Sequence, residues 1–342
     1  MLERAPRLSR PGTTPNWFAS VMGSGIVATA LPAPLSVLRP VVTVVWALAA
    51  VWLVVLVWQL VADRRRQHRH LRDPVLVHFW GAPPMALLTI GAGAVALGRD
   101  WIGTGPALVA GAVLWTAGTA LGLVTAVGVP YRMITGRIPA AEPFAGWLMP
   151  VVPPMVSAAT GAALVPHLPA GQPRLALLLA CYAMFGISLF ATVVLLPQIW
   201  HRLVTAGTEA ARVPTLWIVL GPLGQSITAA NLLGAAAPGV LPFEAAAEAF
   251  GLFYGLAAWG FAMLWLAIAA AVTLRTVRAG IPFSLTWWSF TFPVGTCVTG
   301  TSALAAVTGS ALFGGAAVAL YVLLVGAWVT VVLRTGQTWG RR

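Results

Sequence analysis

Apolar stretches of about 20 residues follow one another along almost the whole chain of 342 residues. A helix needs about this length of apolar sequence to cross the hydrocarbon core of a bilayer. Charged residues make up 8% of the chain and apolar residues 59%, whereas a soluble domain carries roughly 25% charged residues. The polar segments between the stretches are too short for a separate soluble domain. The sequence therefore predicts an all-α polytopic membrane protein with a single transmembrane domain over residues 1–342.

The basic residues predict how the helices alternate across the membrane. All 20 are arginines, and 17 of them fall on one side when ten helices are drawn, leaving Arg39, Arg99 and Arg174 on the other. Positive residues stay cytoplasmic, so we expect a multi-pass plasma-membrane protein with both termini in the cytoplasm. The net charge of +12 then reflects topology and not nucleic-acid binding. The predicted helices lie near 16–33, 40–62, 75–97, 106–129, 146–166, 173–201, 213–236, 244–274, 283–308 and 311–333.

Tryptophans and prolines recur at nearly constant spacing and indicate an internal repeat. Five tryptophans lie 63, 67, 70 and 70 residues apart, and each opens an odd-numbered predicted helix. Four prolines follow them at spacings of 70, 68 and 71 residues, while two glycines occupy the comparable stretch of the first helix. The residues are Trp17, Trp80, Trp147, Trp217 and Trp287, then Pro84, Pro154, Pro222 and Pro293, with Gly23 and Gly25 in the first helix.

We interpret the pattern as five parallel copies of one helical hairpin, at about 16–72, 75–137, 146–212, 213–278 and 283–342. Five parallel hairpins close most simply as a ring around a central pore. The proline-kinked odd helices would form the inner layer and the even helices the outer layer. The repeat requires the first helix, which argues against the alternative that Arg4, Arg7, Arg10 and the following apolar run form a cleaved signal peptide.

Polar residues on the odd helices are candidates for lining such a pore. A proline inside a helix frees backbone carbonyls, which at membrane depth are tolerated where they face protein or a water-filled path. For any single proline, shaping the bundle is the better explanation, as is a local bond to the preceding turn for any single hydroxyl. Four prolines at matched positions favour a lined path. The candidate donors are Ser20, Ser24, Ser157, Thr160, Gln225, Ser226, Thr228, Thr291, Thr296 and Thr299.

The sequence places no Asp, Glu or Arg in the middle of a predicted helix. Ionisable residues at membrane depth usually mark proton relays and ion sites. No acid or histidine cluster has the spacing of a metal site, and Cys181 and Cys297 read as small buried apolar residues. We therefore expect no metal, no cofactor and no enzyme activity. Hydroxyl and backbone donors without acids favour an anion, which cytoplasmic arginines would concentrate at the inner mouth.

Two short stretches resemble a known family. PNWFASVMGSGI at 15–26 is similar to the first helix of the tellurite-resistance/dicarboxylate transporter family, and WWSFTFP at 287–293 resembles its ninth helix. The family includes plant slow-type anion channels, malate permease and the sulfite exporter. The resemblance implies a pore lined by the odd helices, a homotrimer, and a phenylalanine that plugs the pore. By motif the plug is Phe292, with Phe290 as its competitor, since residues two apart on a helix face different sides.

The expected function is transport of small inorganic or organic anions through a gated central pore. The alternative is a proton-coupled carrier for C4-dicarboxylates such as malate, or for sulfite. Buried carboxylates for coupling are missing, although a substrate can carry its own proton. A membrane enzyme or receptor would need a catalytic or ligand cluster at one membrane face, and the sequence contains none.

Overall fold

The computed structural model describes residues 13–63, 69–139 and 142–339, and in these ranges the regular structure is helical, without strands. Eight helical segments of the described chain are long and apolar enough to cross a membrane. The terminal arginines at 4, 7, 10, 341 and 342, and those at 64–66, lie outside the described residues. The eight segments are Ala33–Ala62, Leu76–Ile102, Thr104–Ile134, Gln172–Ala206, Ala210–Ala235, Glu244–Ala279, Leu285–Thr308 and Ala311–Thr338.

Two of the predicted crossings are shorter than expected. The predicted helix at 16–33 is α1 (Phe18–Thr29, 12 residues), and the one at 146–166 is α7 (Pro153–Ala162, 10 residues). At 1.5 Å per residue, an α-helix of this length spans roughly half of the 30 Å hydrocarbon core. Each follows a stretch of other helical or turn structure, which lengthens the segment. The structure thus supports eight crossings by length, and the remaining two rest on these composite segments.

Five helices are buried between the others, and we call them the buried helices. Each follows a segment with 3-10 turns, and four carry proline among their first three residues: Pro83 and Pro84 in α4, Pro153 and Pro154 in α7, Pro222 in α9, and Pro293 in α11. A proline is tolerated there because its missing N–H would have no partner inside the helix. These prolines therefore start α-helical segments and do not kink continuous ones. The pairs are η1 (Pro15–Trp17) and α1, η3 (Leu76–Gly81) and α4 (Ala82–Gly93), η5 (Ala145–Leu148) and α7, η7 (Ala210–Val219) and α9 (Leu220–Ala235), and η8 (Leu285–Phe290) and α11 (Phe292–Thr308).

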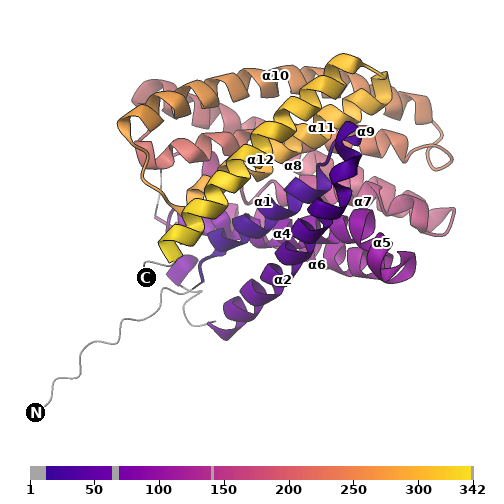
Figure 1. Ribbon diagram of the computed structural model, residues 1–342, viewed down its shortest axis with the longest axis horizontal. Helices are drawn as coiled ribbons and strands as arrows, with labels where there is room; N and C mark the ends of the chain where they lie inside the picture. The colour runs from indigo at the N-terminus through magenta and orange to yellow at the C-terminus, as the bar shows by residue number, and fades with distance from the viewer. Residues whose placement is uncertain (1–12, 64–68, 140–141, 340–342) are drawn as a thin grey trace, which may run out of the picture.

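The buried helices contact one another in a closed order, α1–α4–α7–α9–α11 and back to α1. Five longer helices, which we call the outer helices, each pack mainly on one of them, and Figure 1 shows α10, α12 and α2 along the outside of the molecule. The outer helices expose large apolar side chains such as Val54, Phe190 and Phe253, which suits contact with lipid. They are α2 (Arg39–Ala62), α6 (Thr104–Ile134), α8 (Gln172–Ala206), α10 (Glu244–Ala279) and α12 (Ala311–Trp339).

Glycines bring the two layers close together. A Cβ added at Gly251 of α10 would lie 2.9 Å from the carbonyl oxygen of Ala230 on α9, and one at Gly118 of α6 would lie 3.0 Å from that of Pro84. Both distances are shorter than ordinary van der Waals contact, so only glycine fits. Such close backbone approach is typical of helix packing in membranes, where small residues occupy the interfaces.

The last outer helix also binds the first buried helix. The Tyr321 hydroxyl of α12 donates a hydrogen bond of 2.9 Å to the carbonyl of Val27, and the Trp328 indole donates one of 3.0 Å to the Ser24 hydroxyl. Figure 1 shows α12 running beside α1 across the middle of the molecule. Segments about 300 residues apart in the sequence are therefore joined.

Candidate functional site

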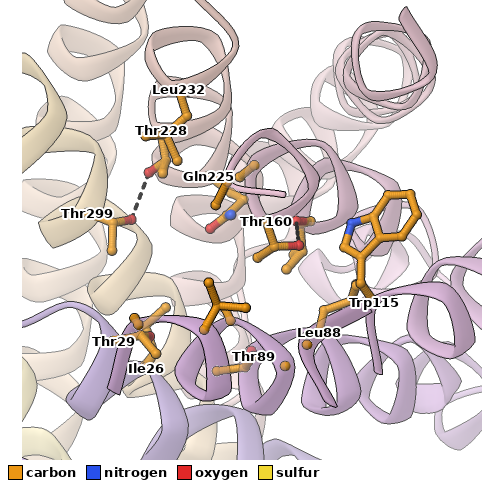
Figure 2. Close-up of a pocket in the computed structure, with 18 of the residues that line it drawn as sticks. Ile26, Thr29, Leu88, Thr89, Trp115, Thr160, Gln225, Thr228, Leu232 and Thr299 are labelled. Carbon is orange, nitrogen blue, oxygen red and sulfur yellow. Dashed lines mark hydrogen bonds between the residues drawn. The ribbon is translucent and has the colours of Figure 1, made fainter. Parts of the chain in front are cut away.

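A cavity of about 200 Å³ lies between the buried helices (Figure 2). All five contribute to its wall, together with Gly111 and Trp115 of α6. It lies near the ends of several short buried helices: Thr29 ends α1, Leu164 follows α7, and Leu232 lies near the end of α9. The residues that line it are Ile26, Thr29, Leu88, Thr89, Gly91, Ala92, Val95, Ala96, Gly111, Trp115, Val156, Ala159, Thr160, Ala163, Leu164, Gln225, Thr228, Leu232, Phe292 and Thr299.

The wall is mostly apolar, and its polar side chains are five threonines, one tryptophan and one glutamine. No lining residue is ionisable. Among the described residues, no three histidines, cysteines or acids come together as metal ligands would. An anion in the cavity would thus meet neutral hydrogen-bonding groups and hydrocarbon, without a fixed positive charge.

Hydrogen-bond donors of the threonines and the tryptophan are already engaged. Each threonine hydroxyl is within donating distance of a backbone carbonyl of the preceding helical turn, and the Trp115 indole donates to the Ser157 carbonyl at 2.9 Å. Their oxygens therefore present lone pairs to the cavity. The hydroxyl bonds run from Thr29 to Gly25 (3.2 Å), Thr89 to Met85 (2.7 Å), Thr160 to Val156 (2.8 Å), Thr228 to Gly224 (3.0 Å) and Thr299 to Thr296 (3.0 Å).

Gln225 differs from these residues. The residue is 5% exposed, and no described residue forms a hydrogen bond with its amide. Figure 2 shows the amide end lying between Thr160 and Thr299, in the space that the cavity occupies. Nearby, Thr228 and Thr299 bond to each other at 2.7 Å and tie α9 to α11.

Phe292 lines the cavity, whereas Phe290 does not. Phe292 is the first residue of α11 and is 2% exposed. Phe290 packs edge-on against Trp217 and Trp287, with ring centroids at 5.3 and 5.8 Å. The two aromatic side chains thus occupy different surroundings, as their spacing along the chain predicts.

Four serines from the predicted donor set face the outer helices and do not line the cavity. Each accepts a hydrogen bond from an outer-helix side chain, so these bonds join the two layers. Ser20 accepts from the Trp52 indole (2.9 Å), Ser24 from the Trp328 indole (3.0 Å), Ser157 from the Thr119 hydroxyl (2.9 Å) and Ser226 from the Tyr254 hydroxyl (2.8 Å).

The remaining predicted residues shape the contacts between buried helices. The Thr291 hydroxyl donates to the Trp288 carbonyl and sits where a Cβ on Gly23 would fall. The Thr296 hydroxyl lies between α11 and α9, within hydrogen-bond distance of the carbonyls of Pro293 and Leu220. A Cβ on Gly25 would lie 2.8 Å from Thr89, so this glycine lets α1 approach α4.

The sequence prediction missed three polar residues of the wall. Thr29 and Thr89 lie on odd-numbered predicted helices, so their position in the sequence could have identified them as candidates for the cavity wall. Trp115 lies on an even helix, which the sequence suggested was packing only. Its indole reaches the cavity because Gly161, where a Cβ would lie 2.9 Å from the indole nitrogen, leaves room for it.

Comparison with known proteins gives the family. Residues 12–336 match the SLAC1 family model, described as voltage-dependent anion channel. The chain belongs to this family. An uncharacterized transporter of Methanocaldococcus jannaschii is 28% identical over 334 residues, which are 94% of this chain and 92% of the relative. A sulfite efflux pump of Arthroderma otae is 28% identical over 338 residues, covering 94% of this chain and 89% of the pump.

A second sulfite efflux pump, from Trichophyton rubrum, is 30% identical over 232 residues, 65% of this chain and 61% of the pump. The names of these relatives describe transporters and not enzymes. As a member of the SLAC1 family, the protein is a multi-pass membrane protein that transports anions. A neutral cavity between its buried helices is compatible with that activity.

Proposed function

We propose that anions cross the membrane along the axis of the ring of buried helices, and that Phe292 gates this path. The observation that carries the proposal is the cavity to which all five buried helices contribute and whose wall includes the Phe292 side chain. In α1 the lining residues Ile26 and Thr29 lie in the last turn, whereas Phe292 is the first residue of α11. The aromatic ring would then close the end of the cavity nearer the helix N-termini.

We propose ten crossings, arranged as five parallel hairpins, with both termini cytoplasmic in the plasma membrane. If only the eight long segments crossed, the stretch with Arg69 and Arg72 would lie outside, against the preference of positive residues for the cytoplasm. With ten crossings this stretch is inside, the loop at Thr104 is outside, and Phe292 closes the cytoplasmic end of the cavity.

Cysteine labelling in intact cells separates the two topologies. Thr104 and Thr205 are both exposed. A membrane-impermeant maleimide is expected to label Thr104→Cys and to label Thr205→Cys only after lysis. With eight crossings and a cytoplasmic C-terminus, Thr104→Cys would also be protected, so that result would refute ten crossings. The native cysteines, Cys181 and Cys297, are buried and give a low background.

The gate is tested by conductance of purified protein in planar bilayers. Phe292→Ala removes the ring from the cavity and should raise anion conductance clearly above wild type. Phe290→Ala is the matched control, because it removes an equal volume outside the cavity and should leave conductance near the wild-type value. If Phe290→Ala opened the path and Phe292→Ala did not, the gate assignment would be wrong.

A second candidate function is a proton-coupled carrier for sulfite or for a C4-dicarboxylate such as malate. The observation that favours it is that two relatives are named sulfite efflux pumps. Uptake of sulfite, malate, chloride and nitrate into liposomes, with and without a pH gradient, distinguishes a carrier from a pore. Strict dependence on the gradient would favour the carrier, and uptake that follows only the anion gradient would favour the pore.

We further propose that the chain assembles as a homotrimer through its outer helices. Exposed apolar side chains, including Val54 and Phe190, provide surface for contact with lipid or with another copy. Light scattering of the purified protein, corrected for bound detergent, is expected to give three times the chain mass of 35.7 kDa. A monomer mass over a range of detergents would refute the trimer.

A further inference from the structure

Removing an anion from water is costly unless hydrogen-bond donors replace its hydration shell. The cavity wall supplies few donors that are free to do so. Its five threonine hydroxyls are within donating distance of backbone carbonyls, and the Trp115 indole donates to Ser157. With the protons of these groups engaged, the threonine oxygens face the cavity as acceptors, which repel an anion.

One lining side chain retains uncommitted N–H groups. The primary amide of Gln225 carries two N–H donors and makes no hydrogen bond to any described residue. The residue is 5% exposed, and its amide faces the cavity without a partner from the protein, so water or a ligand has to satisfy its hydrogen bonds. Gln225 therefore has the properties of a residue that contacts a ligand.

The backbone around Gln225 is fixed by contact with α11. A Cβ on the preceding residue, Gly224, would lie 2.4 Å from the backbone nitrogen of Cys297, so α9 and α11 are in direct backbone contact at this level. One turn later Thr228 bonds to Thr299 across the same interface. A donor on a rigid wall loses little conformational freedom when it binds, which favours binding.

We propose that the Gln225 amide is the anion-coordinating group of the cavity, and that it binds an oxygen of a small inorganic oxyanion such as sulfite. This inference rests on the proposed function, because it places an anion in the cavity. The amide supplies N–H donors without a positive charge, so an anion is bound weakly enough to leave again. The oxygens of an oxyanion accept from the amide, and a protonated oxyanion can also donate to the threonine oxygens.

Sulfite uptake by the purified full-length protein in liposomes tests the assignment. Gln225→Glu keeps the shape of the side chain but replaces the N–H donors with a negative charge, and Gln225→Leu removes all polar atoms. Hydrogen bonds to charged groups are worth enough to predict a fall of about tenfold to a hundredfold in uptake at low sulfite concentration. Gln198→Leu is the matched control, because it removes an exposed amide of α8 that is outside the cavity.

Thermal unfolding in detergent, measured on each variant, checks that the fold is intact. Reduced uptake by both Gln225 variants, with the melting temperature and the Gln198→Leu control unchanged, supports the proposal. Uptake within twofold of wild type in both Gln225 variants overturns it and leaves the proposed function standing. A wild-type protein that moves neither sulfite, chloride, nitrate nor malate would instead refute the proposed function.

Discussion

Replacing Gly224 by alanine tests whether direct contact between α9 and α11 holds the ring together. The added Cβ would lie 2.4 Å from the backbone nitrogen of Cys297 and 2.5 Å from the carbonyl carbon of Thr296, where ordinary contact begins at 3.4 Å. The two helices would have to separate by about 1 Å, since backbone atoms cannot rotate away. Overpacking of this kind costs roughly 1–3 kcal/mol, and we expect the upper half of that range.

The measurement is thermal unfolding of the purified protein in detergent, with Gly221→Ala as the control. Gly221 lies one turn earlier on the same helix, and a Cβ there would lie 3.9 Å from its nearest neighbour, Pro293. Gly224→Ala should unfold several degrees below wild type, whereas Gly221→Ala should unfold at or above the wild-type temperature. Equal melting temperatures for the two variants would refute the argument from backbone contact.

Substitutions at Trp52 and Glu142 test one hydrogen bond and one ion pair. Trp52→Phe removes the indole that donates to Ser20 and should cost about 1 kcal/mol, with little further loss in the double variant with Ser20→Ala; fully additive losses would contradict a direct bond. A hydrogen bond from Arg202 and its charge hold the pKa of Glu142 below its usual range. The ion pair therefore stabilises the protein at pH values above the pKa that Glu142 has in the unfolded chain, and this stabilisation is lost as the pH falls and the carboxylate is protonated. Acidification should then lower the melting temperature of wild type slightly more than that of Glu142→Gln.

The layer to which a helix belongs follows from the sequence. The spacing of tryptophans and prolines identified the helices that are buried in the structure, because the 3-10 turns and the prolines near helix starts recur with the same period. The position of the prolines within these helices did not follow from the sequence. Pro84 and Pro293 lie in the first turn of α-helical segments instead of bending longer ones, and hydropathy does not distinguish these arrangements.

Which side of a buried helix faces the cavity could not be predicted. A buried helix is apolar on all sides, so its hydropathy pattern carries no information about rotation around its own axis. Ser157 and Thr160 lie on the same helix, yet Ser157 bonds to an outer helix and Thr160 lines the cavity. Likewise, nothing in the sequence distinguishes Gln225 from its neighbour Ser226. In the structure the packing of α9 turns Gln225 toward the cavity.

The bonds from Tyr321 and Trp328 to α1 have a consequence for biogenesis. The ribosome delivers the chain from its N-terminus, so α1 enters the membrane long before α12 exists. Until α12 arrives, the Val27 carbonyl and the Ser24 hydroxyl lack these donors. The contact between α1 and α11 that closes the ring of buried helices also forms only after most of the chain has been made. Such late closure between distant segments also makes folding slow compared with that of a bundle held by local contacts.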